Sequence, residues 1–357
     1  MSPLPAADDL LPFSDSAARA DQLGELQPEA LELLHRQGWL TLLAPRAVGG
    51  GEWALPDVVR LEEAVAAADG SAAWVLTLCA GAAWFAGFWP HDLARELLAT
   101  PGVCLAGSGA TTGVAERDGA GWRVSGHWAH ASGAPWATHF TFNAALQEGS
   151  QPVLDAAGQP RVRSFVVPAA EVTLHKTWHS QGLRASRSDA FELRDAWVAE
   201  RQVFDIAVDA ATHAGPLYRF PFRAFACVTL GANLLGLAGR FLALAGPLIE
   251  QRTQRRGLSD SAALAGWRAA DAALREARER FYAALDAAWA GAAAGQPVPA
   301  AVAAELEALS QALVAVARDA ISQTYPACGL WAADMRSELN RVWRDFHTAS
   351  QHAIWLG

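Results

Sequence analysis

The segment RDFHTASQHA, residues 344–353, combines two histidines with a serine and a threonine near the end of the chain. An imidazole titrates near neutral pH, so it can serve as a general acid or base or as a metal ligand. His347 and His352 are five residues apart, about 140° on an ideal helix, whereas a two-histidine metal clamp needs a spacing of three or four. This spacing disfavours a metal site, and we predict none in the chain.

The same segment predicts a polar stripe on a helix. If the helix is continuous, Asp345, Thr348 and His352 lie along one stripe. Such a stripe is commonly solvated surface, and the alternative is that it faces a cavity. Spacing alone leaves both interpretations open.

A glycine-rich segment, GSGATTG at residues 107–113, follows the apolar VCLA and could suggest a dinucleotide-binding loop. That fingerprint requires a helix that begins at the glycines, so that its amides meet the pyrophosphate. Here the following VAERDGAGWRVSG predicts a strand, a turn and a second strand. We therefore predict a flexible loop at the rim of a β domain.

Composition excludes several classes of protein. The 357 residues are 52% hydrophobic with a formal net charge of −9 and dispersed basic residues, which argues against nucleic-acid binding. We see no apolar run of the roughly 18 residues that a membrane span requires, and Ala72 to Phe88 reads as a buried helix. The acidic, proline-containing N-terminus and the lack of CxxC spacing predict a cytoplasmic protein. The cysteines, predicted as small core residues, are Cys79, Cys104, Cys227 and Cys328.

Hydrophobic periodicity divides the chain into zones. Apolar residues recur at three- and four-residue spacing from about 15 to 100, alternate with period two from about 102 to 205, and return to helical spacing from about 215. This pattern predicts an α+β protein. We expect an N-terminal helical domain (1–101), a middle antiparallel β domain (102–212) and a C-terminal helical bundle (213–357).

Segments spread along the chain resemble the acyl-CoA dehydrogenase superfamily. They are 38–76 (GWLTLLAPRAVGGGEW and the helix that follows), 121–142 with 182–200, and 325–353. The resemblance implies an N-terminal helical domain, a β-barrel or sandwich and a C-terminal four-helix bundle. It also implies a flavin, FAD or FMN, between the β domain and the bundle, in a homodimer or homotetramer.

The resemblance assigns flavin contacts to three residues of the β domain. In HWAHASG, His130 occupies the position of the aromatic side chain that lies against the isoalloxazine, and Ser132 the position of a hydroxyl at its polar edge. Ser108 stands where backbone groups meet the pyrimidine edge of the ring. A hydroxyl at a ring nitrogen or carbonyl can respond to the change of charge on reduction.

Further cofactor contacts are implied in the C-terminal zone. Arg252, Arg255 and Arg256 stand where arginines of the superfamily hold the pyrophosphate of a neighbouring subunit's FAD, a task that suits the planar guanidinium. Gly329 matches a glycine of the loop that closes on the cofactor from the partner. The alternative for the arginines is a solvated basic helix end.

The catalytic residue departs from the dehydrogenase pattern. The superfamily's base is a glutamate nine residues after the arginine of RD, and here that position is Ala353, which cannot take a proton. His352 instead resembles the histidine of the two-component flavin monooxygenases, such as those that act on hydroxyphenylacetate and dibenzothiophene. Those proteins receive reduced flavin from a separate reductase. Ala82 stands where many of them carry a second histidine.

We therefore predict a flavin-dependent monooxygenase that uses reduced flavin, O2 and a small organic, aromatic substrate, with His352 and Ser132 as catalytic residues. One alternative is an acyl-CoA-type dehydrogenase acting on CH–CH donors, with a base such as Glu250 or Glu276. Another is a non-catalytic flavin-binding scaffold. Aromatic residues at 84, 85 and 88 could line a substrate cavity or belong to the core.

Overall fold

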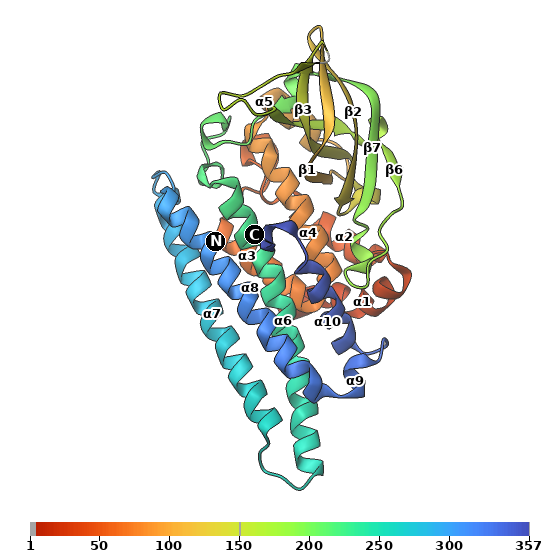
Figure 1. Cartoon of the computed structure of the whole chain (residues 1–357), viewed down its shortest axis with the longest axis vertical. Coiled ribbons are helices and arrows are strands. Elements are labelled where there is room, and N and C mark those ends of the chain that lie inside the picture. The colour runs from red at the N-terminus through yellow and green to blue at the C-terminus, as the bar shows by residue number, and fades with distance from the viewer. Residues whose placement is uncertain (1–4, 150, 357) are drawn as a thin grey trace.

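The computed structural model describes residues 5–149 and 151–356. Its sheet lies at one end of the elongated molecule, and long C-terminal helices extend away from it (Figure 1). The N-terminal helices are α1 (Leu11–Leu23), α2 (Pro28–Arg36), α3 (Leu55–Ala68), α4 (Gly70–Trp84) and α5 (His91–Leu98). A proline in the first turn begins α1, α2 and α3. The Asp69 carboxylate caps α4 by accepting hydrogen bonds from the amides of Ser71 and Ala72.

The middle zone folds into a twisted sheet. Its strands are β1 (Leu105–Asp118), β2 (Gly121–Ala131), β3 (His139–Glu148), β4 (Gln151–Pro152), β5 (Val162–Pro168), β6 (Thr173–His175), β7 (Asp189–Ala199) and β8 (Val203–Phe204). They pair in the order β6-β7-β2-β1-β3-β5-β8, with β4 on β3. The pairs are antiparallel except β1 with β3, which is parallel, so the expected all-antiparallel sheet needs correction. β2 and β3 flank β1 on opposite sides, and the chain reverses twice between β1 and β3.

We predicted that the glycine-rich segment 107–113 is a loop. It is instead part of β1. The pairing register with β3 shifts between Ser108 and Thr111 and again between Thr111 and Gly113, so the strand is bulged there. Gly113 must lack a side chain, because a Cβ would lie 2.2 Å from the Trp128 ring. Close packing of this strand, and not phosphate binding, accounts for a glycine at that position.

Long helices complete the molecule: α6 (Phe222–Arg255), α7 (Ala262–Ala293), α8 (Ala300–Cys328), α9 (Leu330–Ala333) and α10 (Glu338–Ala349). The α6 helix packs against α3, α7, α8 and α10, and so connects the N-terminal helices to the C-terminal bundle. This helix, sheet and helix-bundle arrangement is the one predicted. The domain boundaries at 101 and 212 stay a prediction.

By length and composition, three helices in the described part of the chain could cross a membrane: Gly70–Phe88, Phe222–Arg255 and Ala300–Cys328. The expectation that no apolar stretch reaches this length was therefore wrong. The most apolar windows of the first two are 83% and 78% buried inside the protein, and that of the third is 33% buried. The first lies between β1 of the sheet and α6, and Ala72 to Phe88 lies largely buried as predicted.

Candidate functional site

A cavity of about 450 Å3 lies where the sheet meets α4, α6 and the turn after α10. Its lining is mainly apolar and aromatic, a composition typical of small-molecule pockets. The sheet side is formed by Gly107, Ser108, Gly109, Thr141, Phe142, Asn143, Ser164, Phe204 and Ile206. The helix side is formed by Thr77, Leu78, Gly81, Ala82, Phe85, Phe222, Arg223, Phe225, Ala226, Thr229 and Leu230, and the C-terminal turn by His352, Ala353 and Ile354.

His352 lines this cavity, but it does not lie on the helix. Because α10 ends at Ala349, His352 instead caps a short 3-10 helix, and the helical spacing argument does not apply to it. The Ile354 amide donates to His352 Nδ1 over 3.3 Å. Burial lowers the pKa of His352, and the nearby His130 lowers it further. The imidazole is thus neutral at pH 7 with its proton on Nε2, which is free to donate a hydrogen bond.

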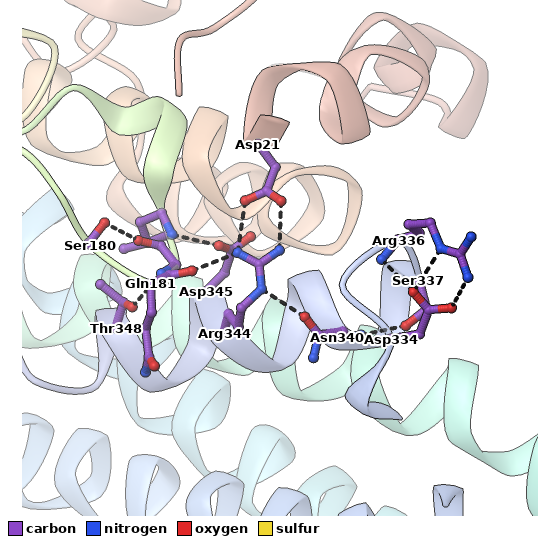
Figure 2. A network of polar contacts seen from close by, with 12 residues as sticks. Asp21, Ser180, Gln181, Asp334, Arg336, Ser337, Asn340, Arg344, Asp345 and Thr348 are labelled. Carbon is purple, nitrogen blue, oxygen red and sulfur yellow. Dashed lines mark hydrogen bonds and ion pairs between the residues drawn. The ribbon is translucent and has the colours of Figure 1, made fainter. Parts of the chain in front are cut away.

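On α10, Arg344 and Asp345 are buried and Thr348 is half-buried, so these polar side chains are not a solvated surface; Figure 2 shows their contacts with neighbouring segments. Arg344 is buried and forms a bidentate ion pair with Asp21 of α1. Its guanidinium also donates to the Gln181 carbonyl and to Asn340. The stripe is polar because it joins α10 to α1 and to a loop of the sheet, where buried donors need partners.

That loop, residues 177–188, is fastened to α10 by two amides. The Leu183 amide donates to Asp345, and the Gly182 amide donates to the Thr348 hydroxyl over 3.1 Å. Figure 2 labels the two acceptors, Asp345 and Thr348. Gly182 lies so close to the helix that a Cβ would be 2.1 Å from the Arg344 carbonyl oxygen. Burial raises the pKa of Asp345 to about 7, against the opposing effect of the Leu183 hydrogen bond. The C-terminal helix thus positions the loop next to the predicted flavin contacts.

Ser132 and His130 lie beside this loop and outside the cavity lining. Ser132 is buried, and its hydroxyl shares a hydrogen bond of 2.8 Å with Ser188, which shares another of 2.8 Å with Ser186. His130 is exposed, with a positive φ of 64°, and its ring meets Trp178 edge-on at 5.8 Å. The structure therefore places His130 near His352, whereas Ser132 is enclosed among hydroxyls.

Ser108 is the predicted β-domain contact that lines the cavity itself. Thr77 faces it from α4, where its hydroxyl accepts a hydrogen bond of 2.8 Å from the buried Asn233 amide. Behind them lies Glu62, which is fully buried next to Thr77. Burial raises the pKa of Glu62 well above its usual range, against the opposing effect of the Thr77 side chain.

The predicted phosphate contacts lie at the other end of α6. Arg252 donates to the Ala327 carbonyl and packs on Gly329, where a Cβ would be 2.2 Å from its guanidinium. Arg255 and Arg256 are exposed. About 30 residues of helix, or roughly 45 Å, separate them from the cavity at Phe222. The structure groups Arg252 with Gly329 but does not bring this set to the cavity of its own chain.

Other lining residues follow a mixed pattern. Phe85 lines the cavity, whereas Trp84 and Phe88 belong to the buried core. Ala82 and Ala353, the two positions that lack the expected histidine and glutamate, are both at the cavity wall. Glu250 and Glu276, the alternative bases, are exposed and are not part of the lining.

Sequence reasoning missed the cavity contacts at Arg223, Asn143 and Thr77. The only signal for Arg223 was its place in the first turn of a long apolar helix, and nothing marked Asn143 or Thr77 as functional. Asn143 donates to the Gly109 carbonyl over 2.9 Å and accepts from the Ser164 hydroxyl. These two hydrogen bonds connect β1, β3 and β5.

The residues present fit the ring system of a flavin with an aromatic substrate. Gly81 and Gly109 leave open space at the wall, since a Cβ at either would meet no atom within 4 Å. Between them lie phenylalanine rings, a donor imidazole at His352 and hydroxyls. In the described part of the lining, the one formally charged side chain is Arg223. The cavity can thus bind a flat aromatic group but holds no cluster of cations for a pyrophosphate.

Comparisons with known proteins agree with this geometry. The sequence model of the acyl-CoA dehydrogenase C-terminal domain matches residues 228–355. Indole-3-acetate monooxygenase of Pseudomonas putida is 26% identical, covering 94% of this chain and 85% of its own. The oxygenase subunit HsaA, a flavin-dependent monooxygenase of Mycobacterium tuberculosis, is 25% identical, covering 99% and 91%.

Solved structures show the same fold. The crystal structure of HsaA from M. tuberculosis superimposes with a TM-score of 0.90 at 23% identity, over 99% of this chain and 93% of that chain. XiaF from Streptomyces, in complex with FADH2 and glycerol, superimposes with a TM-score of 0.86 at 22% identity, over 98% and 91%.

Proposed function

We propose that the chain is a member of the acyl-CoA dehydrogenase superfamily and the oxygenase component of a two-component flavin monooxygenase; the match of residues 228–355 and the similar proteins support this. A separate reductase would supply it with reduced FAD or FMN. Its relatives are named as monooxygenases, and XiaF was solved with FADH2. Its substrate would be a small aromatic molecule.

One observation carries this proposal. The wall of an apolar, aromatic cavity presents an imidazole at His352 and an alanine at the neighbouring Ala353, where a dehydrogenase would place its glutamate. No lining residue in the described part of the chain carries a carboxylate. Abstraction of a substrate α-proton therefore has no carboxylate base, whereas a neutral imidazole can donate a hydrogen bond to a reacting oxygen.

The reaction balances as follows. Reduced flavin supplies two electrons when it is bound; one atom of O2 enters the substrate, and the other leaves as water. His352 would orient the substrate hydroxyl or the reacting oxygen through Nε2–H. Ser132 and His130 would hold the flavin ring beside the loop that α10 positions, and Ser108 its polar edge. The apolar walls exclude water, which favours transfer to substrate over loss of peroxide.

The phosphate side of the cofactor would come from a second chain. Arg252, Arg255, Arg256 and Gly329 lie too far from their own cavity, which supports a homodimer or homotetramer in which each flavin contacts two chains. A cytoplasmic location stays a prediction, for which the support is that the four buried cysteines are free.

A reconstituted assay tests the proposal. Purified protein is mixed with NADH, a general flavin reductase, FAD or FMN, and a panel of phenols and indoles in air. We expect a hydroxylated product that requires both this chain and the reductase. Bleaching of bound flavin by an acyl-CoA under nitrogen would instead establish a dehydrogenase. A protein that shows neither activity and binds no flavin would contradict both enzymatic assignments.

A further inference from the structure

Arg223 gives the cavity a positive charge. Among the lining residues that the structure describes, Arg223 alone carries a formal charge. Its side chain is 54% exposed, which places it at the opening. Its Nε donates to Glu307 of α8 over 2.9 Å. The two terminal nitrogens have no partner among the described residues. The ion pair thus orients the guanidinium and leaves the side of the fork that recognises carboxylates available.

The helix that carries Arg223 reinforces this charge. Arg223 lies in the first turn of α6, whose N-cap residue, Pro221, has no side chain that can accept a hydrogen bond. The first turn contains no acidic residue. The amides of this turn have no acceptor within the helix, and its dipole places partial positive charge at the same end of the cavity.

Two acidic side chains near the opening are paired with arginines. Glu307 has one oxygen on Arg223 and lies on α8, outside the lining. Asp205, between the lining residues Phe204 and Ile206, is paired with Arg163. Burial of Glu62, behind the wall, raises its pKa well above the usual range of a carboxyl. The groups that the opening offers to an anion are therefore the terminal nitrogens of Arg223 and the first-turn amides of α6.

We propose that this cavity selects aromatic substrates that carry an anionic group, such as a carboxylate, which binds Arg223 at the opening while the ring extends inward toward His352. The inference rests on the proposed function and specifies its substrate class. The apolar interior suits one or two fused rings, and the terminal nitrogens of Arg223 can bridge both oxygens of a carboxylate.

Binding to the protein in the absence of flavin tests the proposal without relying on turnover. Two series with constant rings and varied charge serve as probes: 4-hydroxyphenylacetate, its amide and tyramine; and indole-3-acetate, its amide and tryptamine. Dissociation constants are measured by calorimetry, then KM and kcat in the reconstituted assay. We expect each acid to bind about tenfold more tightly than its amide, the effect of one charge-assisted hydrogen bond, and the amine to bind least.

Variants locate the effect. Arg223→Gln should abolish the preference for the acid by raising its Kd and KM about tenfold, while the Kd of the amide stays unchanged. Arg223→Lys should retain part of the preference. Glu307→Gln should strengthen acid binding a few-fold by removing the counter-ion. Arg275→Gln is the matched control, because Arg275 is also a surface arginine whose Nε contacts a carboxylate, Asp271, at 2.8 Å.

The results separate this inference from the proposed function. If the amides are hydroxylated as well as the acids, or if Arg223→Gln keeps the acid preference, the inference is wrong and the monooxygenase assignment stands. If none of the six compounds binds, the inference is likewise overturned. If the protein neither binds flavin nor forms product with any aromatic compound, the proposed function itself fails.

Discussion

His352 and His347 are neighbours in sequence with different surroundings, and this difference defines a test at the level of residues. His352 lines the cavity with a free Nε2–H, whereas His347 packs on Trp343 at 4.4 Å between ring centroids and is not part of the lining. A spacing argument that treated both as residues of one helix could not separate them, because the helix ends at Ala349.

We predict that His352→Ala lowers the yield of hydroxylated product per NADH about tenfold, the effect of one lost hydrogen bond to a reacting group. The lost electrons should appear as hydrogen peroxide. Flavin affinity should change little. His347→Ala is the control, and its yield of hydroxylated product per NADH should equal that of the wild type. If both variants and the wild type give the same yield of hydroxylated product per NADH, His352 has no part in the mechanism.

Motifs pointed to some residues that line the cavity and not to those brought there by tertiary structure alone, and the roles of the predicted site residues stay predictions. The resemblance led to His352 and Ser108, which both line the cavity. Arg223, Asn143 and Thr77 reach it from three separate elements, and no local pattern identifies such a convergence. The roles of Ser132 and His130 stay predictions.

Among the helices, α4 shapes the cavity through a residue without a side chain. Gly81 lines the cavity, and a Cβ there meets no atom within 4 Å. Gly239 of α6 has the same open surroundings but lies on the exterior. Valine is a slightly better helix former than glycine, so the substitution changes helix propensity by a similar, small amount at either position.

We predict that Gly81→Val lowers kcat/KM for an indole substrate at least about tenfold, since it fills space that the second ring requires, and lowers it less for a phenol. Gly239→Val should leave both values unchanged. Melting temperatures of the two variants should agree. An equal loss with both substrates would show that the second ring does not extend to α4.

The connection of α10 to loop 177–188 predicts a pH dependence of stability. The pKa of Asp345 is about 7 in the folded protein because of burial, against an ordinary value of 3.8 in the unfolded chain. Between these values the unfolded state loses the proton and the folded state keeps it, so the free energy of unfolding falls as pH rises from about 4 to 7. At about 1.4 kcal/mol per pH unit, the loss is on the order of 4 kcal/mol.

Asp345→Asn keeps an oxygen that can accept from the Leu183 amide but removes the titration. We therefore predict that the variant gains stability relative to the wild type as pH rises across this range, by a few kcal/mol. Urea unfolding at several pH values measures the difference, with Asp271→Asn on the exposed face of α7 as a control. A difference that does not change with pH would contradict the raised pKa.

At the level of the whole molecule, periodicity was sufficient for the order of helices, strands and helices. It was not sufficient for the topology of the sheet, because the parallel pairing of β1 with β3 depends on which side of β1 each later strand occupies. It also misplaced the glycine-rich segment 107–113, since bulged strands and loops share the same composition.

The position of the α6 arginines leads to a prediction about assembly. If they bind the pyrophosphate of a neighbouring chain's FAD, then Arg255→Ala with Arg256→Ala should weaken FAD binding about tenfold or more and leave FMN binding unchanged, because FMN has no pyrophosphate. Fluorescence titration with both flavins and light scattering for the oligomeric state provide the measurements. A protein that is monomeric and binds FAD fully would contradict this account.

Isotope labelling tests the central claim most directly. The reconstituted system is run under 18O2 with an aromatic substrate that it hydroxylates, and the product is examined by mass spectrometry beside a control in H218O with ordinary O2. A cavity that binds reduced flavin beside a donor imidazole predicts heavy oxygen in the product under 18O2 and none from labelled water. Product labelled from water, or oxidised substrate without added oxygen, would contradict the monooxygenase assignment.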